Sequence, residues 1–150
     1  MTRPRLTTLA ALALTLGVTA SGLAQTADPA SIIRERREGL RAVAANVEAL
    51  QAIAVGRTDP RAGLPRIAAI ATFFTNFPDR FPPSTQAGDT RALPGVFTDR
   101  AGFVAVYTAF QVQLANVQTV AAAGDSAAFG PALQQMGASC GNCHRPYRGR

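Results

Sequence analysis

Side chains that bind metals or form covalent bonds are scarce in this sequence. Its 150 residues include two cysteines, one histidine and no lysine, and all 15 positive residues are arginines. A structural zinc site uses four ligands, so cysteine and histidine alone could not complete one here without a carboxylate. The scarce residues are not dispersed, because Cys140, Cys143 and His144 lie together in the C-terminal segment SCGNCHRPYRGR.

Two sequence patterns are absent. No segment alternates apolar and polar residues with the period of a half-buried strand, so we expect no β-sheet. No block of like charges and no basic stripe with interleaved aromatic residues occurs, so nucleic acid is not expected as a partner. The net charge of +6 is spread along the chain among acidic residues, as expected for solvated helix faces.

The N-terminal segment has the pattern of a secretory signal peptide. Two arginines precede the apolar run LTTLAALALTLGV, and small residues follow in ASGLAQ. The run is shorter than the roughly 18 residues of a membrane-spanning helix, so no stable membrane insertion is expected. We predict a signal peptide over residues 1–24, cleaved after Ala24 or alternatively after Ala20, and one exported domain over residues 25–150.

Apolar residues recur at helical spacing through the rest of the chain. Intervals of three, four and seven residues predict four amphipathic helices, joined by two short links and one long link. This combination predicts an all-α fold, an antiparallel four-helix bundle. The first helix covers residues 31–55, the second begins after Asp59, the third begins at Thr98 or Asp99 and ends at Gly124, and the fourth begins at Asp125 or Ser126, bent or delayed by Pro131.

The long link, residues 77–98, contains four prolines that exclude a regular helix or a central strand. Loops of about 20 residues without structure of their own are uncommon in compact domains. We therefore expect Phe77, Phe81 and Phe97 to hold this link against one end of the core.

The C-terminal segment CGNCH matches the attachment pattern of a c-type haem, C-x-x-C-H. On a helix, Cys140 and Cys143 share one face and His144 lies one turn after Cys140, so two thioethers and one axial nitrogen could hold one porphyrin. A disulfide or a thiol redox pair is an alternative, although thioredoxin-like pairs belong to an α/β fold. A metal site completed by a carboxylate is the other alternative.

A sixth iron ligand is difficult to find in the sequence. Electron-transfer cytochromes commonly use a second histidine or a methionine on the opposite haem face. His144 is the only histidine, and Met136, the only methionine beyond the signal segment, lies on the same predicted helix. The sequence therefore predicts five-coordinate iron with an open or hydrophobically blocked sixth position, which suits the neutral gases NO and CO.

Four segments carry a resemblance to one protein family: RREGL, LPGVFTDRAGF, GDSAAFGPALQQMGASC and CGNCHRPYR. In their order and spacing, residues 31–150 resemble the cytochromes c′, four-helix-bundle c-type cytochromes of bacterial periplasms. The resemblance implies one haem c per chain, covalently attached near the C-terminus at Cys140 and Cys143 and ligated by His144.

The resemblance also assigns three further residues to the haem site. Arg36 matches a recurrent arginine of the first helix, and Leu40 matches the bulky residue that blocks the distal haem face. Arg148, four residues after His144, matches a basic residue beside the proximal pocket. The chain departs from the family at Pro146, which could displace Arg148 because proline disrupts the helix. Without haem, a cavity is expected between Leu40 and His144.

The expected function is that of a periplasmic haem protein, not an enzyme, which binds NO and CO and scavenges NO. Electron transfer to a periplasmic redox partner is one alternative, and a haem-free helical protein with a disulfide between Cys140 and Cys143 is another. The resemblance also implies a homodimer formed through the first two helices. Ile32, Ile53 and Ile70 could supply its outward apolar contacts, or could equally belong to the core.

Overall fold

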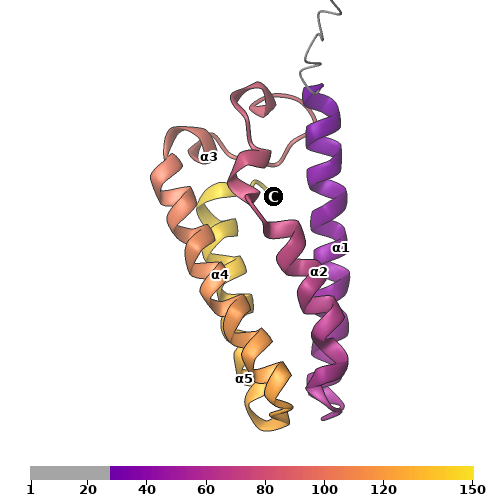
Figure 1. The fold of residues 1–150 in the computed structure, drawn as a ribbon. Coiled ribbons are helices and arrows are strands. Elements are labelled where there is room, and N and C mark those ends of the chain that lie inside the picture. The colour runs from indigo at the N-terminus through magenta and orange to yellow at the C-terminus, as the bar shows by residue number, and fades with distance from the viewer. Residues whose placement is uncertain (1–27) are drawn as a thin grey trace, which may run out of the picture.

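The computed structural model describes residues 28–150, in which four long helices pack along one another (Figure 1). The predicted signal peptide, residues 1–24, lies outside the described residues. The long helices are α1 (Pro29–Val55), α2 (Leu64–Phe74), α4 (Arg100–Ala123) and α5 (Ser126–Tyr147). The short helical turns are η1 (Pro60–Gly63), η2 (Phe77–Arg80), η3 (Pro83–Thr85) and α3 (Gly95–Thr98).

Helix pairs define the architecture. Figure 1 shows α1 beside α2 and α4 beside α5, and both pairs are in direct contact. Residues 28–150 contain no named strand, only an isolated bridge between Ala92 and Arg148. The prediction of an all-α four-helix bundle is therefore confirmed. No helix in this part of the chain is long and apolar enough to cross a membrane.

Aspartates cap three of the long helices. Asp28, Asp99 and Asp125 each accept hydrogen bonds from backbone N–H groups in the first turns of α1, α4 and α5, at 2.9–3.1 Å. Gly124 ends α4 in a left-handed conformation, with φ of 72°. Because Asp125 satisfies the first donors, α5 begins directly at Ser126, and the predicted delay of this helix by Pro131 is wrong.

The second predicted helix begins later than expected. Asp59 caps the 3₁₀ turn η1, where its carboxylate accepts from the N–H of Arg61 at 2.9 Å. The α-helix itself starts only at Leu64. Pro65 explains this break, because it has no N–H to donate to the preceding turn and so cannot continue an α-helix that began at Pro60.

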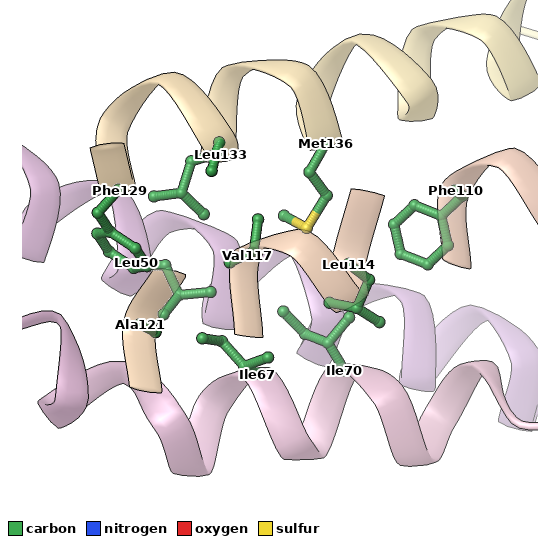
Figure 2. Packing of buried hydrophobic residues seen from close by; sticks show 11 residues of the cluster. Leu50, Ile67, Ile70, Phe110, Leu114, Val117, Ala121, Phe129, Leu133 and Met136 are labelled. Atoms are coloured by element: carbon green, nitrogen blue, oxygen red, sulfur yellow. The ribbon is translucent and has the colours of Figure 1, made fainter. Parts of the chain in front are cut away.

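One hydrophobic cluster, the central cluster, occupies the middle of the bundle (Figure 2). All four long helices contribute to it, largely through the predicted apolar stripes. Ile70 is fully buried here, so it belongs to the core and offers no outward dimer contact. The buried members of the central cluster are Leu50, Ile67, Ile70, Phe110, Leu114, Val117, Ala121, Phe129, Ala132, Leu133 and Met136.

A second cluster, the aromatic cluster, gathers the long link against α4 and the end of α5. Its buried members are Phe77, Phe81, Val96, Phe103 and Tyr147. The rings of Phe81 and Phe103 meet edge to face with centroids 5.1 Å apart, and Phe97 packs against the same cluster. The prediction that the phenylalanines of the long link hold this link against the core is therefore confirmed.

Gly39 allows the ring of Phe73 to lie directly against α1. A Cβ atom at this position would overlap that ring. Phe73 in turn packs against the aromatic cluster and meets Phe74 edge to face, with centroids 5.4 Å apart. Glycine inside a helix costs roughly 1 kcal/mol relative to alanine, so its presence in α1 is explained by this close approach.

We expect Gly39→Ala to destabilise the protein although alanine favours a helix. Overpacking costs about 1–3 kcal/mol, against roughly 1 kcal/mol gained in helix propensity, so urea unfolding should show a net loss of up to about 2 kcal/mol. In a Phe73→Ala background the overlap is removed, and Gly39→Ala should then be neutral or stabilising. An equal loss in both backgrounds would show that the ring contact is not the cause.

Candidate functional site

The three residues of the C-x-x-C-H segment lie in the last turns of α5, which is yellow in Figure 1. Cys140 and Cys143 are half-buried free thiols, and His144 is exposed. Cys140 packs against the central cluster, whereas Cys143 packs against the aromatic cluster. The two thiols therefore lie at the boundary between the clusters, with the imidazole on the adjacent residue.

Burial changes the protonation of these groups. Withdrawal from water raises the pKa of both thiols, and the nearby charge of Cys140 raises the pKa of Cys143 further. The pKa of His144 is lowered, first by partial shielding of the ring from water and then by the positive charge of Arg148. At neutral pH the thiols are therefore protonated, and the neutral imidazole has a nitrogen lone pair available to a metal.

Leu40 reaches the same end of the bundle from α1. It is half-buried and packs against the aromatic cluster, as Cys143 does from α5. The two helices also contact each other directly. Leu40 of the first helix and Cys143 of the C-x-x-C-H segment therefore border the same cluster, although they are distant in the sequence.

Arg36 is almost completely buried, with 3% of its surface exposed. Its guanidinium group donates to the carbonyl of Arg80 at 2.9 Å, and to the hydroxyls of Thr85 and Thr90 at 3.4 and 2.8 Å. It also lies 4.1 Å from the ring centroid of Phe81. These partners are neutral, and among residues 28–150 no carboxylate forms an ion pair with it. Burial lowers the pKa of this group.

Arg148 lies just beyond the end of α5 and is exposed. Pro146 has no N–H to donate toward Asn142, and the helix ends one residue later, at Tyr147. The backbone of Arg148 is extended, with φ of −129° and ψ of 124°, while its N–H donates to the carbonyl of His144 at 3.1 Å. The residue has therefore left the helix but remains close to the imidazole whose pKa it lowers.

Tyr147 fixes the end of α5. Its hydroxyl donates to the carboxylate of Asp99 at 2.8 Å, and its carbonyl accepts from the N–H of Leu93 at 3.0 Å. The hydrogen bond to Asp99 is the main cause of the raised pKa of Tyr147. The sequence places Tyr147 on an apolar helix face but contains no signal that links it to a carboxylate 48 residues earlier.

Two surface hollows stand out among the described residues. One lies between the start of α1 and the loop at Gly88, and the other lies beside η2, at Pro82. Neither is lined by Leu40 or His144, so the cavity that we expected between these residues is not found at either place. Leu40 instead packs directly against the aromatic cluster.

The side chains present fit a covalently attached haem c. Two protonated thiols three residues apart on one helix can add to two vinyl groups, and the neutral imidazole of the next residue can ligate iron. The apolar contacts of Leu40 and Cys143 suit a porphyrin face. Among residues 28–150, no group of three or more histidine, cysteine, aspartate or glutamate side chains is placed to hold a metal ion by itself.

Comparisons with known proteins agree with this chemistry. The family described as Cytochrome C' matches residues 31–148. Cytochrome c-556 from Agrobacterium fabrum is 34% identical over 122 residues, which cover 76% of this chain and 79% of that protein. Cytochrome c' from Rhodospirillum rubrum is 29% identical over 150 residues, which cover 96% of this chain and 97% of that protein.

Solved structures share the fold. A nitric oxide complex of a variant of cytochrome c prime from Alcaligenes xylosoxidans matches with a TM-score of 0.75 and 25% identity, covering 83% of this chain and 98% of that one. A carbon-monoxide-bound variant of the same protein matches with a TM-score of 0.75, 25% identity and the same coverage. The chain therefore belongs to the cytochrome c′ family, whose cofactor is covalently attached haem c.

Proposed function

We propose that this protein is an exported haem c protein that binds NO and CO at an iron with no sixth protein ligand. The observation that carries the proposal is the packing of Met136, the only methionine among residues 28–150. Its side chain is 1% exposed within the central cluster, and it lies on α5 together with His144 (Figure 2). The described residues hold no second histidine and no lysine, so none of these ligands is left for the opposite face of the haem.

Each residue of the C-x-x-C-H segment then has one role. Cys140 and Cys143 would anchor the cofactor through two thioether bonds, because the S–H of a thiol can add across a vinyl group, with the sulfur bonded to one carbon and the hydrogen to its neighbour. His144 would provide a nitrogen ligand for the iron, and its imidazole is neutral because its pKa is lowered. When bound, the haem supplies an iron coordination position for a diatomic gas.

Leu40 and two arginines complete the proposed site. Leu40 presents only hydrocarbon, so it would restrict access to the iron and would offer no hydrogen-bond donor to a polar ligand. NO and CO need no such bond, and an apolar barrier therefore selects for them. Arg36 provides a buried positive charge for the cofactor, and Arg148 places a second one beside His144.

Further support comes from the relatives and the N-terminus. Two structures of variants of the similar Alcaligenes protein are complexes with nitric oxide and with carbon monoxide. The predicted signal peptide, residues 1–24, supports export to the periplasm, where NO scavenging is the role that we propose. Ile32 and Ile53 are both partly exposed, but Ile53 packs against the central cluster, so Ile32 is the predicted outward residue left for a homodimer contact.

Expression with haem attachment in a bacterial periplasm should yield a protein heavier by the mass of one haem. The visible spectrum of the reduced protein should be that of five-coordinate iron. It should shift on addition of CO and of NO, because no protein ligand competes for the sixth coordination position. Intact-mass measurement and absorption spectroscopy test both points. In the control, Cys140→Ser combined with Cys143→Ser, the added mass should be lost.

Two results would contradict this proposal in different ways. A six-coordinate spectrum that CO does not change would exclude gas binding and favour electron transfer to a periplasmic partner. An unchanged mass after expression in a haem-attaching host would instead favour a haem-free protein, with a disulfide between Cys140 and Cys143.

Leu40→Ala should accelerate CO association about tenfold, because loss of the side chain removes a steric barrier of about 1.4 kcal/mol. Flash photolysis of the CO complex measures this rate. Leu64→Ala is the matched control, since Leu64 is also half-buried but packs against the central cluster. If the two variants bind CO at the same rate, Leu40 does not control access to the iron.

A further inference from the structure

Arg80, in η2, has a buried side-chain nitrogen without a partner. Its Nε is the one buried side-chain nitrogen or oxygen among residues 28–150 that makes no hydrogen bond. The guanidinium group forms no ion pair within the same residues and lies 5.0 Å from the ring centroid of Phe73. Buried polar groups nearly always have a partner, so this nitrogen points to a ligand of the side chain.

The acidic residues of the same loop are engaged by other arginines. Asp79, next to Arg80 in η2, lies 3.7 Å from the guanidinium of Arg100, which comes from α4. Asp89 pairs with Arg37 of α1. Arg36, which donates to the backbone carbonyl of Arg80, is also cationic. Within residues 28–150, no carboxylate therefore forms an ion pair with Arg36 or Arg80.

The guanidinium groups of Arg36 and Arg80 both lie over rings associated with the aromatic cluster. Arg36 donates to the carbonyl of Arg80 at 2.9 Å, so the two residues adjoin. One guanidinium stacks on Phe81 and the other on Phe73. Both rings take part in the aromatic cluster, against which Leu40 and Cys143 also pack.

We infer that Arg80 binds a propionate carboxylate of the haem, as a second cationic residue beside Arg36. Haem c carries two carboxylates at one edge of an apolar ring, and a guanidinium group is the side chain whose paired donors match a carboxylate. A carboxylate would accept from the buried Nε and neutralise the charge. The inference rests on the proposed attachment of haem at Cys140 and Cys143.

The reduction potential of the haem-loaded protein, measured as a function of pH, tests this inference. Ionisation of a propionate changes the charge near the iron and produces an inflection in that curve. In Arg80→Gln the carboxylate loses a cation, so its proton affinity should rise about tenfold and the inflection should move up by roughly one pH unit. Arg80→Lys keeps the charge and should leave the inflection close to that of the wild type.

Arg100→Gln is the matched control. Arg100 also lies beside η2 and over a phenylalanine, 5.7 Å from the centroid of Phe103, but its charge is already paired with Asp79. Its loss should leave the inflection in place. An unmoved inflection in Arg80→Gln, or an equal shift in Arg100→Gln, would overturn the inference. If the wild-type protein lacks the added mass of a haem, the proposed haem attachment is overturned as well. Intact-mass measurement therefore distinguishes a wrong role for Arg80 from the absence of attached haem.

Discussion

The buried guanidinium of Arg36 organises the end of the bundle on which the site depends. The link between α2 and α4 has only short helical turns, so many of its polar groups need partners from elsewhere. Arg36 donates to one carbonyl and two hydroxyls of this link and stacks on Phe81. Arg36 therefore holds the segment that closes the aromatic cluster, together with its neighbour Arg37, which binds Asp89 of the same link.

A second polar contact fixes the opposite side of the site. Asp99 caps α4 through Oδ1 and accepts the hydroxyl of Tyr147 through Oδ2. The start of α4 and the end of α5 are thereby joined through one carboxylate, less than one turn after His144. The central cluster holds the four helices together, but these two contacts at the end of the bundle set the positions of the side chains that would meet a haem.

Features that depend on near neighbours could be predicted from the sequence. Apolar spacing located the four helices, and Asp99 and Asp125 cap them because capping involves only the following turn. The C-x-x-C-H segment could also be recognised, because its three functional residues are close together in the sequence. The predicted start of the second helix, directly after Asp59, was wrong because Pro65 interrupts the helical hydrogen bonding and the α-helix begins only at Leu64. The partners of Arg36 could not be predicted, because they lie 44 to 54 residues away in a loop without periodicity.

The unusual features of this region have one explanation in common. A buried cation without an anion, a buried donor without an acceptor and half-buried thiols between two hydrophobic clusters are each unfavourable or neutral for a helical bundle alone. Apolar residues of similar volume at Arg36 and Arg80 would pack without that cost. A ligand with an apolar face and a carboxylate edge satisfies all three features together. This shared explanation is the physical ground for our proposal that these residues form a cofactor site.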